Sequence, residues 1–175
     1  MYTRIGCKVK AFFRNKYVNS CYTSVLSSPP RILGDITINA KNVKFGSNVV
    51  IYPGVYIWGE NIEIGNNVNI GVGTIIFSRK RVYIGDDTII AGQCYIIDSN
   101  HSIDKNMVIQ KQSLKTAVEG IFIGKDVWIG AQCSILKGAK INNGAVIGAQ
   151  SLVNKEIPSY AVAFGTPAEV KSYRK

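Results

Sequence analysis

A six-residue period in the placement of aliphatic side chains constrains the fold of this chain more than any other feature. From residue 123 onward the period is unbroken and is carried by Ile123, Ile129, Ile135, Ile141, Ile147 and Val153. An α-helix repeats every ~3.6 residues and a strand every two, so neither element alone produces this spacing. A short fixed period is typical of a solenoid, in which each repeat stacks on the one before it.

The same period runs upstream in groups of three. Within a group the step is six residues, and between groups it stretches to seven or eight: Phe45, Ile51, Ile57; Ile64, Ile70, Ile76; Ile84, Ile90, Ile96. Three six-residue edges make one coil, so the longer steps place the insertions at one corner of that coil. Pairs such as Ser47-Asn48 and Pro53-Gly54 follow the aliphatic anchors and favour the bends that corners require.

A second, inward layer is predicted four residues after most anchors, where the side chains are small or β-branched: Val49, Val55, Val68, Thr74, Thr88, Cys94, Val127, Cys133, Ala139, Ala145 and Ser151. The sequence therefore predicts an all-β protein made of stacked triangular coils, a parallel β-helix. A sandwich of short strands also shows alternating apolar residues and frequent turns. A sandwich does not require the strict six-residue period that this sequence keeps over five coils.

The period divides the chain into three parts. Residues 1–31 form a basic, partly amphipathic N-terminal extension, which we expect to be helical and either to cap the coil or to rest on an anionic membrane surface. Residues 32–158 form the β-helix, with an inserted loop over 98–122 where the step between anchors jumps to 27 residues. Residues 159–175 form a C-terminal tail, expected to be a turn or short helix.

Composition limits the classes of partner. The net charge is +10, with 21 Lys and Arg against 11 Asp and Glu, which indicates an anionic partner. The chain shows no recognition helix or aromatic platform of a nucleic-acid binder. A phosphate-bearing cofactor, a pyrophosphate-linked sugar or an anionic membrane face fits better. No apolar run approaches the roughly 18 residues that span a bilayer, so we expect a cytoplasmic protein that could act at the inner membrane face.

The inserted loop holds the only histidine of the chain, His101, within Asp98-Ser99-Asn100-His101-Ser102. Loops inserted into a rigid scaffold commonly carry function. Imidazole, with an ordinary pKa near 6.5, is the side chain best suited to accept a proton at neutral pH. A zinc centre built from three imidazoles is not predicted, because one histidine per chain cannot supply it.

A family resemblance lies in residues 123–170, IGKDVWIGAQCSILKGAKINNGAVIGAQSLVNKEIPSYAVAFGTPAEV. This stretch resembles the hexapeptide acetyltransferases that modify sugars, including the maltose and galactoside acetyltransferases and the O-antigen, capsule and polysialic-acid O-acetyltransferases. The DSNHSI stretch, with Trp128 following, is similar to the polysaccharide-modifying branch. The resemblance covers roughly residues 32–170 and implies a left-handed coil, acetyl-CoA as donor, and homotrimers with active sites between adjacent subunits.

The resemblance also implies roles for individual residues. His101 would act as general base in the direct transfer of acetyl from acetyl-CoA to a carbohydrate hydroxyl, without a metal. Asp98 is the first candidate to orient the imidazole, with Asp104 and Glu119 as alternatives. Trp128 precedes an anchor, so it should point outward and stack on sugar or pantetheine. The predicted acetyl-CoA contacts are Gly130, Ala131, Gly148, Ala149, Lys155 and Arg174, with a backbone N–H near Gly130 or Ala131 as oxyanion donor.

Other functions stay open at this point. An N-acetyltransferase acting on an amino-sugar nucleotide and a serine or antibiotic acetyltransferase of the same fold are the enzymatic alternatives. A structural β-solenoid scaffold is the non-enzymatic one. The sugar enzymes carry an Asn-x-Asn element that is replaced here by Ile70-Gly71-Val72-Gly73, so acceptor recognition should differ. An outward stripe of Trp58, Phe77, Ile97 and Leu136 predicts contact with a neighbouring subunit or with the N-terminal extension.

Overall fold

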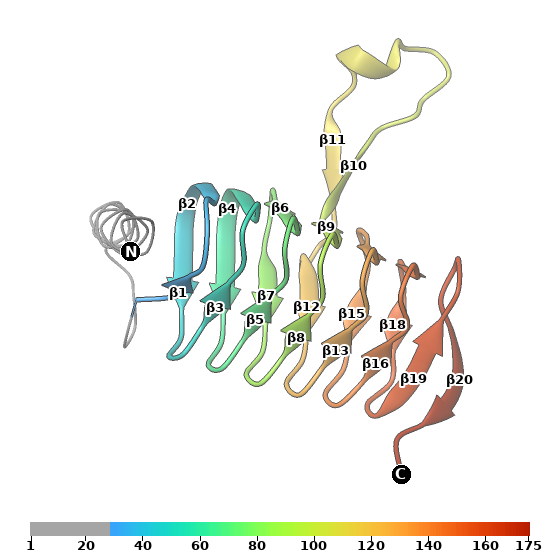
Figure 1. The fold of residues 1–175 in the computed structure, drawn as a ribbon. Coiled ribbons are helices and arrows are strands. Elements are labelled where there is room, and N and C mark those ends of the chain that lie inside the picture. Colours follow the sequence, from blue (N-terminus) through green and yellow to red (C-terminus); the bar gives the residue numbers. More distant parts are fainter. Residues whose placement is uncertain (1–28) are drawn as a thin grey trace.

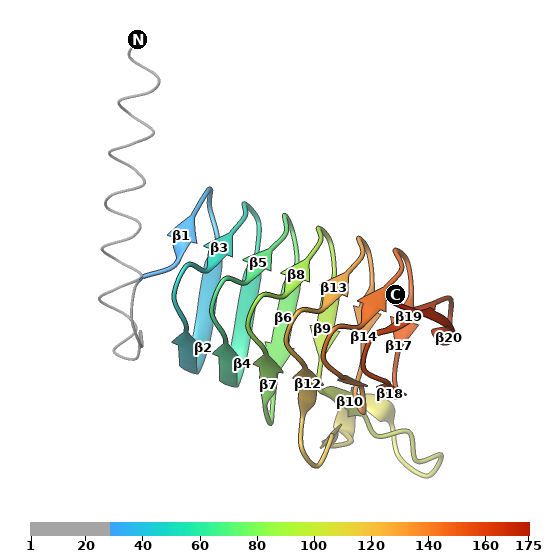
Figure 2. The same ribbon diagram turned by 90° about the horizontal axis from the view of Figure 1, so that it is seen from below.

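A computed structural model describes residues 29–175 as a three-sided parallel β-solenoid (Figure 1). Its strands stack along one axis, and seen from below the coils follow one another in chain order (Figure 2). The expected N-terminal helix falls on residues 1–28, which lie outside the described residues. The predicted β-helix is confirmed in its all-β, coiled character, and its left hand stays an implication of the family resemblance.

The first face is an eight-stranded sheet, in which seven strands run parallel and the last is antiparallel. Each of its parallel strands belongs to a different coil, so the described chain makes seven turns. The strands, in stacking order, are β1 (Arg31–Ile32), β3 (Val50–Ile51), β5 (Asn69–Ile70), β8 (Ile89–Ile90), β13 (Trp128–Ile129), β16 (Val146–Ile147), β19 (Ala161–Phe164) and β20 (Glu169–Tyr173).

The second and third faces belong to one sheet that bends around a corner. Two long strands, β2 (Thr37–Phe45) and β4 (Tyr56–Ile64), continue from one face to the other. The second face continues with β6 (Ile75–Ser78), β9 (Tyr95–Ile97), β14 (Ser134–Ile135) and β17 (Leu152–Val153). The third face continues with β7 (Val82–Ile84), β12 (Ile121–Ile123), β15 (Lys140–Ile141) and β18 (Glu156–Ile157).

The core fills the inside of the prism and follows the predicted period. Every anchor from Phe45 to Val153 is buried, and so is every predicted member of the inward layer. Parallel pairing places each anchor directly over its counterpart in the next coil, as with Ile51 and Ile70, and then Ile70 and Ile90. Cys94 and Cys133 are free cysteines, buried at the inward positions that the period predicts. Continuous aliphatic ladders therefore hold the coils together.

The corners carry the backbone conformation that the turn residues predict. Three residues after an anchor the chain turns through positive φ, as at Asn48 (57°), Asn67 (57°) and Asp87 (59°). We call this edge, between the third and first faces, the asparagine corner; the edge between the first and second faces, which includes Ala131 and Ala149, is the alanine corner. Amide side chains stack along the asparagine corner, with Asn48 donating to Asn67 at 3.1 Å and Asn67 to Asp87 at 2.8 Å.

The inserted loop forms an arm that stands away from the prism (Figure 1). It leaves from the edge between the second and third faces, here called the arm corner. Two antiparallel strands, β10 (Ser99–His101) and β11 (Leu114–Thr116), form its stem, and a short 3-10 helix, η1 (Ile109–Lys111), lies near its tip. The prediction of an insertion at one corner is confirmed.

The C-terminal tail differs from the expected turn or short helix. Residues 161–164 continue the coil as β19, parallel to β16, and β20 then folds back against β19 as an antiparallel strand. The antiparallel strand covers the edge of the first face, which would otherwise offer unpaired backbone groups to another chain.

Candidate functional site

His101 lies at the end of β10, where its side chain is exposed to solvent. It pairs in register with Leu114 of β11. Directly after it, Ser102 fastens the stem, because its N–H and its hydroxyl both donate to the Ser113 carbonyl, at 3.1 and 2.8 Å. Further out, the Gln112 amide bridges the loop by accepting from the Asp104 N–H and donating to the Asp104 and Met107 carbonyls. The imidazole is therefore presented by a hydrogen-bonded stem.

Asp98 is fully buried at the base of the arm. Its carboxylate accepts the backbone N–H groups of Arg79, Lys80 and Arg81 at 2.7–2.9 Å and the Ser78 hydroxyl at 3.3 Å. Among the hydrogen bonds of residues 29–175, none joins Asp98 to His101. The hydrogen bonds that Asp98 does make tie the arm to the preceding coil.

The alternative partners of His101, Asp104 and Glu119, have no hydrogen bond or ion pair with it in residues 29–175. Asp104 accepts the Asn106 N–H at 2.8 Å within the outer loop of the arm. Glu119 is exposed where the chain returns to the coil. The described contacts therefore assign no carboxylate to the imidazole.

Trp128 projects from the first face and is 55% exposed, as its position before an anchor predicts. It lies between Ile89 of the preceding coil and Val146 of the next one. The first face, which includes β13, is opposite the arm corner, from which β10 leaves (Figure 1). A single chain therefore holds Trp128 of β13 and His101 of β10 on different sides of the prism.

The alanine corner lies just beyond Trp128. Here the Gly130 N–H donates to the Ile147 carbonyl at 2.8 Å and the Gly148 N–H to the Ala163 carbonyl at 2.9 Å, so both belong to the coil ladder. A Cβ at Gly130 would lie 2.5 Å from the Ala149 nitrogen. Glycine is therefore needed at this position so that the next coil can stack closely. Within the described chain, the exposed Ala131 and Ala149 have no hydrogen-bond acceptor assigned to their N–H groups. Of the two predicted oxyanion donors, Ala131 is the available one.

Lys155 and Arg174 occupy different corners. Lys155 is exposed at the arm corner, near Glu169, whose pKa is lowered by its hydrogen bond and charge contact with Lys171 and then by Lys155. Arg174 donates to the Asp126 carboxylate at 2.8 Å and to the Gly144 carbonyl at 3.0 Å. Arg174 thus fastens the tail to the asparagine corner and is not an unpaired cation.

Apart from Arg174, the predicted site residues fall into two groups on one chain. His101 and Lys155 lie at the arm corner, while Trp128, Ala131 and Ala149 lie at or beside the alanine corner. The second face separates the groups and is strongly apolar. Trp58 and Phe77 stack there with ring centroids 4.4 Å apart, capped by the Arg79 guanidinium 4.7 Å from the Trp58 ring. Tyr56, Ile75 and Tyr95 form a second, exposed column on this face.

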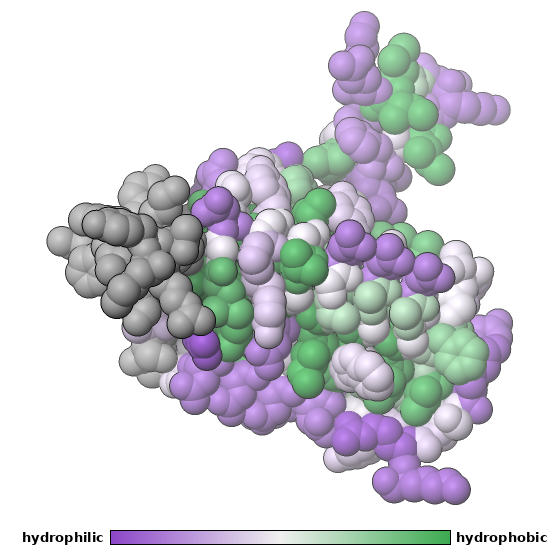
Figure 3. Space-filling view, in the orientation of Figure 1, coloured by the Kyte–Doolittle hydropathy of each residue, from purple (hydrophilic) through white to green (hydrophobic). Residues whose placement is uncertain are grey.

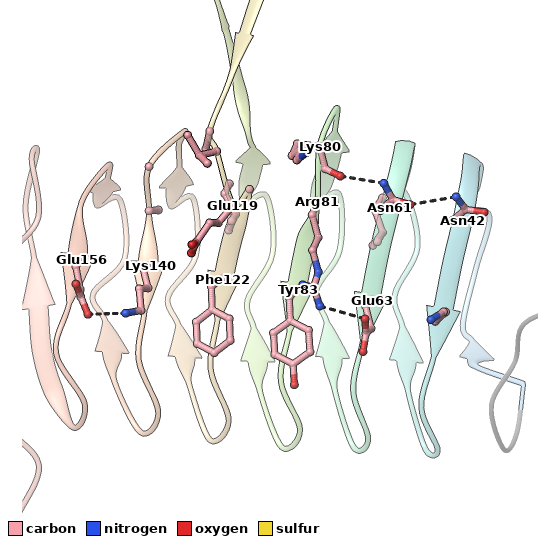
Figure 4. A pocket seen from close by; sticks show the side chains of 18 residues that line it. Asn42, Asn61, Glu63, Lys80, Arg81, Tyr83, Glu119, Phe122, Lys140 and Glu156 are labelled. Carbon is pink, nitrogen blue, oxygen red and sulfur yellow. Dashed lines mark hydrogen bonds and ion pairs between the residues drawn. The ribbon is translucent and has the colours of Figure 1, made fainter.

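A groove of about 1100 Å³ runs along the third face and was not predicted from the sequence. Figure 4 shows its floor, where Tyr83 and Phe122 project side by side from neighbouring strands, flanked by Glu63 and Lys140. The two rings are nearly parallel, at 8°, with centroids 5.2 Å apart. The only sequence signal was an outward residue before each third-face anchor, recurring once per coil as Lys44, Glu63, Tyr83, Phe122, Lys140 and Glu156.

The groove is charged but internally balanced. Arg81 pairs with Glu63 at 3.4 Å and lies 5.6 Å from the Tyr83 ring centroid, and Lys140 pairs with Glu156 at 3.1 Å. The Asn142 amide, and then Lys140, lower the pKa of Glu156. Asn42 donates to Asn61, which donates to the Lys80 carbonyl, and these amides line the upper edge (Figure 4).

Two further features bear on the chemistry. Within residues 29–175 no group of three His, Cys, Asp or Glu side chains could hold a metal ion. The described chain also includes no helix that is long and apolar enough to cross a membrane.

The repeat region of the chain is similar to known proteins. Residues 120–155 match the family described as bacterial transferase hexapeptide (six repeats). Over this stretch, about a fifth of its length, the chain is similar to the hexapeptide-repeat transferases. Over 37 residues it is 57% identical to the galactoside O-acetyltransferase of Lactococcus lactis, a match covering 21% of this chain and 18% of that protein.

A second relative acts on nitrogen. Over 39 residues the chain is 46% identical to the dTDP-3-amino-3,6-dideoxy-α-D-galactopyranose 3-N-acetyltransferase of Aneurinibacillus thermoaerophilus, a match covering 22% of this chain and 20% of that protein. Among solved structures, its fold is similar to that of a mutant of AntD, an N-acyltransferase from Bacillus cereus solved with dTDP-4-amino-4,6-dideoxyglucose and coenzyme A. That similarity has a TM-score of 0.75 at 21% identity, covering 93% of this chain and 89% of AntD.

Proposed function

We propose that this protein transfers an acetyl group from acetyl-CoA to a hydroxyl of a carbohydrate. The observation that carries the proposal is the single histidine, exposed on a hydrogen-bonded arm of a hexapeptide-repeat coil. In the proposed step, His101 accepts the hydroxyl proton as the oxygen attacks the thioester carbon. The carbon–sulfur bond then breaks, and the CoA thiolate leaves with that proton available from the imidazolium.

The proposed active site includes two copies of the chain. His101 and Trp128 lie on different sides of one prism, so a second copy is needed to place an imidazole beside the Trp128 group. The apolar second face, between the arm and alanine corners, supports packing of the copies into a homotrimer. The arm of one copy would then reach the Trp128 and Ala131 region of the next. There the free Ala131 N–H would donate to the developing oxyanion.

Transfer to an amino group is the second candidate. It is favoured by the similarity to an N-acetyltransferase and by the AntD fold. An amine acceptor in its neutral form is already nucleophilic and depends less on a general base than a hydroxyl does. The dependence on His101 therefore separates the two candidates.

The test is the variant His101→Ala, measured with acetyl-CoA against a panel of glycans and amino sugars by release of free thiol. We expect transfer to a hydroxyl to fall by ~10²–10⁴-fold, while the affinity for acetyl-CoA stays within about twofold. Lys115→Ala, on the other strand of the arm stem, is the matched control and should keep full activity. Undiminished turnover by His101→Ala would remove the general-base assignment, and transfer to amines alone would favour the second candidate.

A further inference from the structure

The proposed reaction does not involve the residues that line the groove of the third face. Tyr83 and Phe122 form a flat aromatic strip in the middle of the groove, and Phe122 is 39% exposed. Hydrogen-bonding groups surround the strip on both sides along the coil axis: Asn42, Asn61, Arg81, Glu63, Lys140 and Glu156. We infer that this groove binds an extended carbohydrate chain. The inference rests on the proposed function, because it takes this chain to be the acceptor of the acetyl group.

The chemistry of the lining favours a sugar. A pyranose ring has a C–H face that packs on an aromatic ring and a rim of hydroxyls that exchange hydrogen bonds with planar polar groups. The Tyr83–Phe122 strip supplies the first surface. The carboxylates, amides and guanidinium beside it supply both donors and acceptors. This combination matches ligand sites in which an apolar floor is bordered by a few placed polar groups.

The spacing of the coils favours a chain over a single sugar. Parallel strands repeat every ~4.8 Å, close to the roughly 5 Å advance per unit in an extended β-linked glycan. The lining residues come from six successive coils, between Asn42 and Glu156. Each coil presents one outward residue of the column to one unit of the chain, so several sugars can lie in register with the prism.

The groove leads to the proposed base. Its lining includes Ala117 and Glu119, where the arm rejoins the coil. The Ala117 N–H donates to the Asp98 carbonyl at 3.0 Å, which closes the base of the stem. His101 follows Ser99 by two residues, about 7 Å along β10. A glycan lying on the third face therefore passes the foot of the arm that carries the imidazole.

Two other occupants fit the groove less well. A nucleic acid strand needs a continuous cationic track, whereas here Glu63, Glu119 and Glu156 alternate with Lys44, Lys80, Arg81 and Lys140. A second copy of the chain would bury these charges, and charged residues are depleted from interface cores. The apolar second face is the better surface for a second copy.

The experiment measures binding separately from catalysis. The full-length protein is titrated calorimetrically with β-1,4-linked N-acetylglucosamine oligomers and β-1,4-linked oligouronates, each from one to six units. We expect affinity to rise with chain length. The double variant Tyr83→Ala/Phe122→Ala should weaken binding of the longest bound oligomer by roughly tenfold or more, because the stacking surface is lost. Tyr52→Ala, an equally exposed aromatic on the first face, is the matched control and should bind as the unaltered protein does.

The outcomes distinguish this inference from the proposed function. Oligomer binding that survives in His101→Ala, together with an absence of acetyl transfer by the unaltered protein, would sustain the groove and remove the enzyme assignment. Failure of every oligomer to bind, or equal binding by the double variant, would overturn the groove while leaving transfer untouched. Preferential capture of single-stranded oligo(dT), or a change of oligomeric state in the double variant with its circular dichroism intact, would overturn the carbohydrate assignment.

Discussion

At the residue scale, one carboxylate at the asparagine corner joins several coils. Asp86 accepts from the Asn66 N–H at 2.9 Å and from Lys125 at 2.8 Å, and so links three successive coils. The hydrogen bond from Lys125 is the main cause that lowers the pKa of Asp86, followed by the Asn66 backbone N–H. Arg174 and Asp126 add a similar clamp at the same corner.

Asp86 is expected to make stability depend on acid pH. Because its pKa is lower in the folded protein than in the unfolded chain, its contribution is present at neutral pH and is lost as the pH falls below about 4. Asp86→Asn keeps an acceptor for the Asn66 N–H but removes the charge. We expect it to reduce the free energy of unfolding by about 0.5 kcal/mol at pH 7, and by much less at pH 3. Urea denaturation at both pH values measures the difference, and equal losses would contradict the assignment.

At the element scale, the arm is an ordered hairpin held at its foot by one buried carboxylate. Asp98 receives three backbone N–H groups from the 79–81 turn, and its own carbonyl receives the Ala117 N–H. The outer part of the arm mixes hydrophilic and hydrophobic residues on its surface (Figure 3). Ile103 and Val108, between the two stem strands, are exposed apolar residues. The coil thus determines where the arm begins, and the tip is free to contact a partner.

Replacement of Asp98 tests this positioning role. In Asp98→Asn the amide nitrogen can point a donor at the N–H groups of the turn, so we expect the free energy of unfolding to fall by roughly 2–3 kcal/mol. Transfer should drop through kcat, with little change in the Michaelis constant for acetyl-CoA, since the arm and not the donor site is displaced. Asp104→Asn, which affects one hydrogen bond in the outer loop, is the control. Unaltered stability of Asp98→Asn would show that the turn does not need the charge.

At the scale of the whole molecule, the three faces differ in character. The first exposes Ile89 and Trp128, the second carries two columns of apolar side chains, and the third bears the charged, aromatic groove. Burial of exposed aromatic and aliphatic side chains is the main gain of a stable subunit interface. The second face, with its two columns of apolar side chains, is the surface on which we propose that assembly depends.

Assembly can be tested at Ile75, which is 37% exposed at the centre of the second face. Ile75→Glu would place a charge in the proposed interface, so light scattering should show the mass of a trimer for the unaltered protein and of a monomer for the variant. Transfer should be lost with assembly, because His101 and Trp128 then stay apart. Val170→Glu, on the C-terminal strand, is the control. A monomeric unaltered protein with full activity would contradict the two-copy site.

The amino-acid sequence alone determined the coil. The period of anchors such as Ile64 and Ile70 is a local property, and it predicted the buried ladders, the corners and the place of the insertion. The sequence also predicted which side chains point outward where this depends only on adjacent residues, as for Trp128. The hydrogen bonds of Asp98 could not be predicted in this way, because its partners lie 17–20 residues upstream in another coil.

Only the tertiary structure decided which residues meet. Stacking brings together side chains whose sequence separation depends on every insertion between them, so Tyr83 and Phe122 become neighbours across the whole arm. Lys155 and Arg174 lie at different corners because β20 folds back antiparallel to β19, and His101 and Trp128 lie on different sides of the prism because the arm leaves the coil at the corner opposite the first face. The period specifies the position of a residue around the coil, whereas its contacts depend on the register between coils.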